Sequence, residues 1–177
     1  MTPKLFLEMS PDTHSALWAH LLPEPFLLEE AAFAYTRVES AEGAWVFTVI
    51  DWQPVPPEGF VYQTEIGFEL TDDMRSIVIK RAHDLEASLV ELHSHTGPWP
   101  AKFSPSDRYG FSEFVPHVWW RLKGRPYLSV VVTRSGFDAF AWTTDAVTAQ
   151  RLNSIRVGGT LIESTKLSPL TASEYYD

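Results

Sequence analysis

The sequence predicts an α/β fold in which a mixed β-sheet is flanked by helices. Apolar runs of strand length alternate along the chain with segments that carry helix-start signals and helically spaced apolar residues. Strands separated by helices favour a sheet with helices packed against it. The 177 residues show no low-complexity segment, internal repeat or clear linker, so we expect one domain spanning 1–177.

The first half of the chain supplies several strands and two helices. Ser10 followed by Pro11 is a strong helix start, and Asp72 and Asp73 suit the first turn of a second helix because the helix dipole favours acids there. In order, we predict a strand over 5–9, a helix from 10 that ends before Pro23, strands over 31–38 and 44–52, an extended stretch over 60–70, and a helix from 71.

The second half begins with a strand over 88–93 and a Gly/Pro-containing loop over 96–103. A helix starts at Pro105, and we expect Pro116 to kink or split it, because proline removes a helical hydrogen bond. A β-hairpin is predicted over 125–143 and a short helix over 145–155. The core should span about 5–145, which leaves 146–177 as a peripheral segment.

Composition excludes several classes of function. The net charge of -9 disfavours binding to nucleic acids or anionic membranes, since both require a basic surface. The absence of cysteine excludes disulfides, thiolate ligands and a cysteine nucleophile. The chain lacks an apolar run of ~18 residues and an N-terminal signal segment, so we expect a cytoplasmic protein.

Two histidines and one aspartate form the candidate metal site. His93 and His95 are two residues apart at a strand end, so their side chains should face the same side. Asp107 comes twelve residues later, in a helix start where Ser104 is the expected N-cap. Two imidazoles and one carboxylate, with a fourth position left to water, are typical of catalytic zinc, although this ligand set also suits iron or manganese.

These residues resemble the signature of the JAMM (JAB/MPN-plus) zinc metallopeptidases, in which an upstream Glu precedes His-x-His, Ser and Asp. Here His93-Ser94-His95 is followed by Ser104 and Asp107 with the family's Ser-x-x-Asp spacing. Eight residues separate His95 from Ser104, one more than in the family pattern. The resemblance covers roughly 5–145 and implies an MPN (JAB)-like fold, one Zn²⁺ per chain held by His93, His95 and Asp107, and an oxyanion-stabilising role for Ser104.

The catalytic base should be a glutamate near the start of the second strand. In the family the base lies where the first helix gives way to the next strand, and Glu30 matches that place best. Glu29 is the alternative, because a one-residue shift reverses the face on which a strand residue lies. Glu65 is a third candidate. Glu91 shares the parity of His93 and could accept a hydrogen bond from an imidazole, or simply be a strand-edge residue.

The resemblance also implies an activity. Family members commonly cleave isopeptide or peptide bonds after the C-terminal tail of ubiquitin or a ubiquitin-like protein. We therefore expect a stand-alone, deubiquitinase-like zinc peptidase that matures or deconjugates a ubiquitin-like protein. Its partners would be the activating and conjugating enzymes of a bacterial pathway, including antiphage systems. The alternatives are a peptidase acting on a sulfur-carrier protein and a non-catalytic MPN scaffold.

Overall fold

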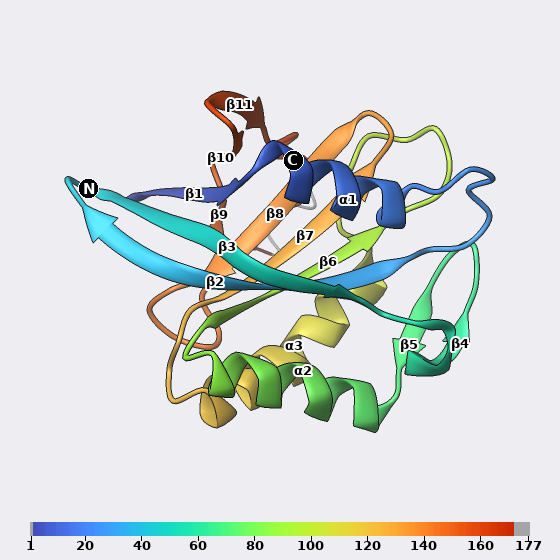
Figure 1. Cartoon of the computed structure of the whole chain (residues 1–177), viewed down its shortest axis with the longest axis horizontal. Helices are drawn as coiled ribbons and strands as arrows, with labels where there is room; N and C mark the ends of the chain where they lie inside the picture. Colours follow the sequence, from blue (N-terminus) through green and yellow to red (C-terminus); the bar gives the residue numbers. More distant parts are fainter. Residues whose placement is uncertain (1, 172–177) are drawn as a thin grey trace.

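A large curled β-sheet organises the molecule. The computed structural model describes residues 2–171, and Figure 1 shows the sheet with helices on both sides. The nine strands of this sheet lie in the order β11-β10-β1-β3-β2-β6-β7-β8-β9, and β4 and β5 form a separate hairpin. The α-helices are α1 (Pro11–Leu21), α2 (Asp72–Asp84) and α3 (Pro105–Arg121), and a 3-10 turn spans Pro57–Gly59. The strands are β1 (Lys4–Met9), β2 (Ala31–Ala41), β3 (Ala44–Pro54), β4 (Phe60–Gln63), β5 (Phe68–Leu70), β6 (Ser88–Ser94), β7 (Tyr127–Thr133), β8 (Gly136–Trp142), β9 (Gln150–Arg151), β10 (Ser154–Val157) and β11 (Thr160–Glu163).

Side-chain caps define where the three α-helices begin. Ser10, Thr71 and Ser104 are the N-caps of α1, α2 and α3, and each hydroxyl accepts a hydrogen bond from a backbone N–H in the first turn. Such a bond satisfies one of the donors that a helix start leaves unpaired. The helix starts predicted at 10, 71 and 105 are therefore confirmed.

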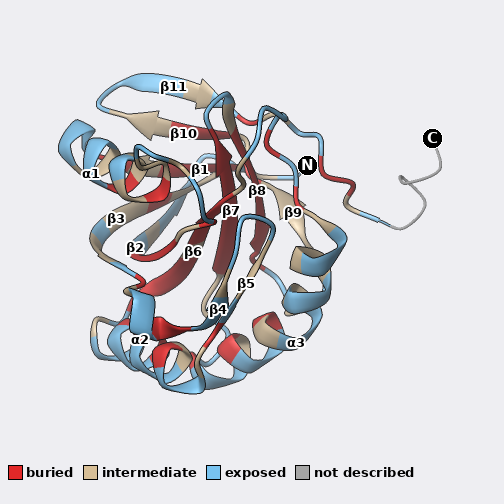
Figure 2. Cartoon of the chain, turned by 90° about the vertical axis from the view of Figure 1, so that its right-hand side faces the viewer, coloured by how far each residue is buried: buried red, intermediate tan, exposed pale blue. Residues whose placement is uncertain are grey.

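The two faces of the sheet carry different helices. Strands β6 and β7 run parallel in its centre, and β2 pairs antiparallel with β6. Helices α2 and α3 cover one face, where Phe33, Tyr35 and Leu89 lie in the core, and α1 covers the other (Figure 1). Figure 2 shows that the buried residues are concentrated in the strands between these layers.

Helix α1 illustrates how the apolar spacing becomes packing. Leu17 and Leu21 are one helical turn apart, and both are fully buried against the sheet. Burying a leucine side chain stabilises a fold by roughly 1.5–3 kcal/mol. The two leucines therefore contribute much of the attachment of this helix to the sheet, and they identify the face that packs.

The structure bears on two predictions about helices. Pro116 does not split α3, which runs from Pro105 to Arg121 with the proline inside it. Pro116 and Ser112, whose carbonyl loses its helical partner, are both exposed, so water can satisfy that carbonyl. The segment over 145–155 is not a helix. It forms a turn, in which the backbone N–H groups of Val147 and Thr148 donate to Asp145, followed by β9 and the start of β10.

The C-terminal segment is part of the sheet, contrary to the expectation that 146–177 is peripheral. Strand β9 pairs with β8 at one end of the sheet, and two residues later β10 pairs in parallel with β1 near the other end. Leu152 and Ile155 in this connection are fully buried. The chain after residue 145 therefore joins the two ends of the curled sheet, as far as the structure describes it; residues 172–177 of the predicted segment lie outside the described part.

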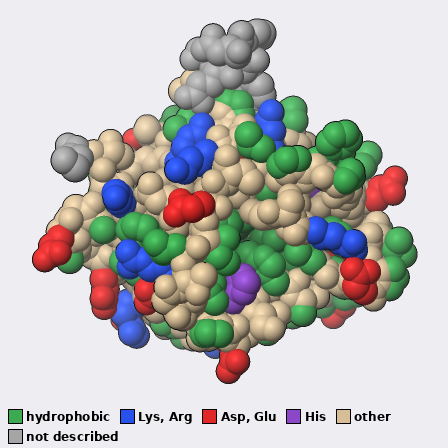
Figure 3. Space-filling model, turned by 90° about the horizontal axis from the view of Figure 1, so that it is seen from above, with side chains coloured by type: hydrophobic (Ala, Val, Ile, Leu, Met, Phe, Trp, Pro, Cys, Tyr) green, Lys and Arg blue, Asp and Glu red, His purple; other side chains and the backbone are tan. Residues whose placement is uncertain are grey.

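The structure also bears on the surface charge of the protein and on the length of its apolar helices. On the face shown in Figure 3, Lys and Arg side chains are interspersed with Asp and Glu side chains. Among the described residues, no helix is both long enough and apolar enough to cross a membrane.

Candidate metal centre

The two histidines face one point because the strand geometry continues past the end of β6. His93 lies on β6 opposite Val131 of β7. The backbone N–H of His95 donates to the carbonyl of Val132 at 3.0 Å, so the chain stays extended for another residue. Residues two apart in an extended chain project to the same side. The predicted convergence of His93 and His95 is confirmed.

Asp107 reaches the histidines from the first turn of α3. A capping box fixes this turn: the Ser104 hydroxyl accepts from the Asp107 N–H at 3.1 Å, and Asp107 Oδ2 accepts from the Ser104 N–H at 2.7 Å. The two reciprocal bonds satisfy donors at the helix start and restrict the carboxylate to one orientation. The helix start therefore positions the ligand as well as ending the loop.

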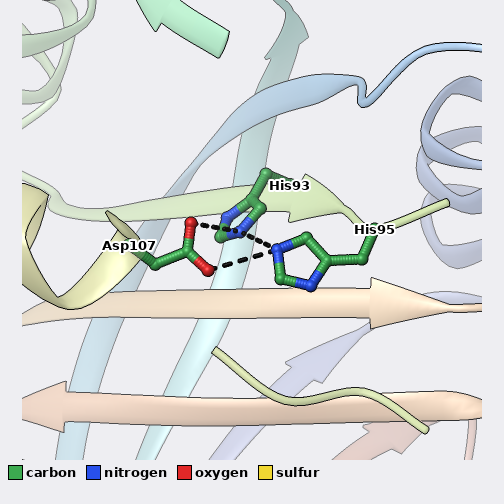
Figure 4. Close-up of side chains that lie close together, drawn as sticks. All are labelled: His93, His95 and Asp107. Atoms are coloured by element: carbon green, nitrogen blue, oxygen red, sulfur yellow. Dashed lines mark hydrogen bonds and ion pairs between the residues drawn. The ribbon is translucent and has the colours of Figure 1, made fainter. Parts of the chain in front are cut away.

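The three side chains have the spacing of a metal site. The Nε2 atoms of His93 and His95 are 3.3 Å apart. Asp107 Oδ1 is 3.2 Å from His93 Nε2, and Oδ2 is 3.1 Å from His95 Nε2 (Figure 4). Two ligands bound tetrahedrally to one ion at ~2.0–2.1 Å lie ~3.3 Å from each other. The group could therefore hold a metal ion without a large rearrangement.

The electrostatics of this group favour a positive charge. Burial by itself lowers the pKa of His93. The negative charges of Asp107 and, to a smaller extent, of Glu91 and Glu29 outweigh this effect and raise the pKa of His93 to about 9. Burial by itself raises the pKa of Asp107, but His93 and His95 hold that pKa well below its usual range. A proton on the imidazole or a divalent cation among the ligands can supply the charge that these surroundings stabilise.

Glu29, and not Glu30, faces the metal ligands, which corrects the prediction of Glu30 as the base. Glu29 Oε1 lies 3.9 Å from His95 Nε2, and the residue is only 6% exposed. The pairing of Ala31 with His93 explains this placement, because Glu29 shares the parity of Ala31. Glu30 has the opposite parity, and its carboxyl group interacts with Gln63 of β4 and with the charge of His20 of α1, and not with His93 or His95.

Ser94, between the two histidines, holds the glutamates in this register. Its hydroxyl accepts from the Glu30 N–H at 2.9 Å, and its own N–H donates to the Glu30 carbonyl at 2.9 Å.

Burial raises the pKa of Glu29, and the charges of His95 and His93 oppose that rise. A carboxyl group shifted toward neutral pH beside a metal group is suited to accepting and returning a proton.

Glu91 lies on the Nδ1 side of the His93 ring, as expected for a carboxylate that supports this ligand. Its Oε1 is 3.8 Å from His93 Nδ1, which is ion-pair distance and too long for a hydrogen bond. The Tyr127 hydroxyl donates to Glu91 Oε2 at 2.7 Å and so orients the carboxyl group. Burial raises the pKa of Glu91, against the pull of His93.

The three candidate metal ligands, called the metal group below, line a cavity of about 840 Å³ between the β4–β5 hairpin and α3. The hairpin tip is joined to the loop after His95, since the Thr96 hydroxyl donates to the Glu65 carbonyl at 2.6 Å. Glu65, the third candidate for the base, has an exposed side chain at the rim of the cavity. Phe103 is buried against the His93 ring, whereas Trp99 is 75% exposed at the rim.

Several residues of this site were not found by sequence reasoning. The cavity wall includes Ile66 and Phe68 of the hairpin, Arg75 of α2, Thr133 of β7 and Leu167 from the C-terminal segment. None of them belongs to a spaced motif, and they come together only through long-range packing. Their one local signal is the Gly67 turn, which bends the hairpin beside the cavity.

Comparisons with known proteins find likenesses among solved structures alone. No protein-family model and no curated protein matches this chain. Among solved structures, the chain is similar to the solution structure of protein DSY2949 from Desulfitobacterium hafniense, with 16% identity and a TM-score of 0.49. That match covers 88% of this chain and 94% of the other. The function must therefore be inferred from the site.

Proposed function

We propose that the chain is a zinc-dependent peptidase of deubiquitinase type, with an MPN-like fold, that cleaves after the C-terminal tail of a ubiquitin-like protein. One observation carries the proposal: the ligand atoms of His93, His95 and Asp107 converge in an open cavity, with the Glu29 carboxyl 3.9 Å from His95 Nε2. Three protein ligands are typical of catalytic zinc sites, and a carboxyl group beside them can act as the general base in hydrolysis.

Zinc is the ion we propose for the three ligands. Two imidazole nitrogens and one carboxylate oxygen are ligands that zinc prefers in catalytic sites. When bound at such a site, zinc supplies Lewis-acid polarisation of a carbonyl group and lowers the pKa of water to ~7. The carboxyl groups of Asp107 and Glu91, 3.2 Å and 3.8 Å from the ring nitrogens of His93, support the binding of a cation, and they also raise the pKa of this imidazole.

Glu29 and Ser104 carry the proposed catalytic roles. Glu29 takes a proton from water and returns it to the departing nitrogen, which is why its placement on the ligand side of β2 matters. Ser104 donates a hydrogen bond to the oxyanion. Its helix cap uses an acceptor position of the hydroxyl and leaves the O–H proton available, so the two roles are compatible.

The substrate assignment is supported by the JAMM-like motif and by the form of the cavity. The cavity is bounded by the β4–β5 hairpin on one side and the start of α3 on the other, and it is open to solvent. In the proposed complex, the extended tail of a ubiquitin-like protein occupies it. A pathway of ubiquitin-like conjugation, including a bacterial antiphage pathway, is the setting that the same resemblance favours.

Metal content is the first test. We expect about one zinc per chain by mass spectrometry in the wild type and loss of zinc in His95→Ala. His117→Ala removes an exposed histidine from α3 and should leave zinc unchanged. A chelator should abolish cleavage, and added zinc should restore it. Wild-type protein that stays metal-free when zinc is offered would contradict the proposal and favour the non-catalytic scaffold.

Cleavage is the second test. Linear fusions and isopeptide conjugates of ubiquitin-like proteins are offered to zinc-loaded protein, beside a sulfur-carrier protein with a C-terminal extension. Cleavage directly after the ubiquitin-like tail supports the assignment. Cleavage confined to the extended sulfur carrier would favour the alternative peptidase. Zinc-loaded protein that cleaves none of them would overturn the peptidase function while leaving the metal site intact.

A further inference from the structure

The C-terminal strap, defined here as residues 164–170, passes beneath the loop that leads into α3. It follows the edge strand β11, and Thr165 N–H donates to the Phe137 carbonyl at 2.9 Å, which places the strap beside β8. Ser168 is fully buried, and Leu167 lines the cavity of the metal group. The strap therefore lies between β8 and the loop that leads into α3.

A buried carboxylate on β8 holds the strap. Asp138 is fully buried, and its Oδ2 accepts from the Ser168 N–H at 2.8 Å. Its Oδ1 accepts from the Ser164 hydroxyl at 2.7 Å and from the Ala139 N–H at 3.0 Å. Three donors therefore converge on this buried side chain, and two of them belong to the strap.

The strap in turn holds the residues that precede the N-cap of α3. The Ser168 hydroxyl accepts from the buried Phe103 N–H at 2.8 Å. The Thr165 hydroxyl donates to the Ala101 carbonyl at 2.7 Å. Phe103 is next to Ser104, whose own N–H donates to Asp107 Oδ2. Hydrogen bonds therefore run from Asp138 through Ser168 to the backbone that carries the ligand Asp107.

The sheet that holds Asp138 also carries the ligand His93, and Asp107, at the other end of this chain of hydrogen bonds, lies 3.2 Å from His93 Nε2. Asp138 pairs with Val131 across β7 and β8, and Val131 pairs with His93 across β6 and β7. Cross-strand neighbours lie on the same face of a sheet. The strap thereby ties the α3 ligand to the row of residues that contains His93, over a loop that has one more residue than the JAMM pattern.

We infer that Ser168 is a positioning residue of the metal centre, which couples the buried Asp138 to the ligand Asp107 through the Phe103 N–H. This inference rests on the proposed metal site. Partners that orient a metal ligand typically change affinity 10–100-fold when they are removed. Without the Ser168 hydroxyl, the buried Phe103 N–H loses its acceptor, and the segment that carries Asp107 is held less firmly, by the remaining bonds of Thr165 to Ala101 and of Arg108 to Pro169.

The experiment measures metal affinity and the coordination spectrum on the full chain. Zn²⁺ affinity is measured by chelator competition, and visible absorption is recorded with Co²⁺ in place of zinc. Ser168→Ala is the main variant, and Thr165→Val removes the second bond between strap and loop with little change of shape. Ser154→Ala is the matched control, because its hydroxyl donates to Glu163 on β11 and touches neither loop nor ligand.

We expect Ser168→Ala to bind Zn²⁺ roughly 10-fold more weakly and to change the Co²⁺ spectrum, with a smaller change in the same direction for Thr165→Val. Ser154→Ala should match the wild type in both readouts. Folding is checked by circular dichroism, and Thr165→Val decides the matter if Ser168→Ala does not fold. Wild-type affinity and spectrum in both strap variants would overturn the inference alone, whereas absence of metal in the wild type would overturn the metal site too.

Discussion

Ala31 on β2 lies directly opposite His93 on β6, and this pairing decides which of two adjacent glutamates faces the metal ligands. Glu29, two residues before Ala31, lies on the same side as His93, and its carboxyl is 3.9 Å from His95 Nε2. Glu30, one residue before Ala31, lies on the opposite side. A register shifted by one residue would exchange the two roles.

Substituting the two glutamates separately tests this relationship. We expect Glu29→Gln to lower kcat by about 10²–10⁴-fold, the usual contribution of a general base, with zinc content unchanged. Glu30→Gln is the matched control, since it makes the same chemical change one residue away on the other face, and it should keep nearly full activity. Steady-state cleavage of a ubiquitin-like fusion is the measurement. Loss of activity in Glu30→Gln alone would refute the assignment.

Ser104→Ala separates helix capping from catalysis. Loss of the N-cap should lower the free energy of unfolding by about 1 kcal/mol. Loss of the oxyanion donor should lower kcat by a further ~10²–10³-fold. Thr71→Ala removes the equivalent cap of α2 and should cost similar stability without this effect on kcat. Denaturant unfolding and cleavage rates are measured on both variants; equal kcat in the two would show that Ser104 only caps the helix.

Pro116 is expected to destabilise α3. A proline inside a helix costs about 3 kcal/mol relative to alanine, and its stiffening of the unfolded chain offsets about 0.4–1 kcal/mol of this. Pro116→Ala should therefore raise the free energy of unfolding by roughly 2 kcal/mol. Pro105→Ala is the control: Pro105 occupies the first helical turn, where proline fits, so its replacement should be neutral or slightly destabilising. Destabilisation by Pro116→Ala would mean that α3 requires the proline.

The metal group was predictable because its signals are local. The spacing of His93 and His95 requires only an extended backbone, and the cap formed by Ser104 and Asp107 requires only the first turn of a helix. The convergence of strand and helix on one point was the single long-range assumption, and the JAMM-like pattern of residues supplied it. The proposed activity depends on the same pattern and stays a prediction.

The C-terminal segment was misjudged because its signals are not local. Gln150–Arg151 and Ser154–Val157 are too short for a strand period to be recognised, and they are extended because β8 and β1 offer them unpaired edges. Ser168 and Asp138 are ordinary polar residues in the sequence. They acquire a role only in the folded chain, where Asp138 accepts from the Ser168 N–H and the Ser168 hydroxyl accepts from the Phe103 N–H.

The sequence by itself determined the class of fold, the helix starts and the residues that can bind a metal, since caps, alternation and ligand spacing act within a few neighbouring residues. Only the tertiary structure decided that Glu29 faces the ligands and that the strap anchors the loop before Asp107. Both outcomes depend on strand register and on contacts between residues more than sixty positions apart, such as Phe103 and Ser168. The conformational preferences of neighbouring residues do not predict such contacts, because burial and packing of the whole chain select them.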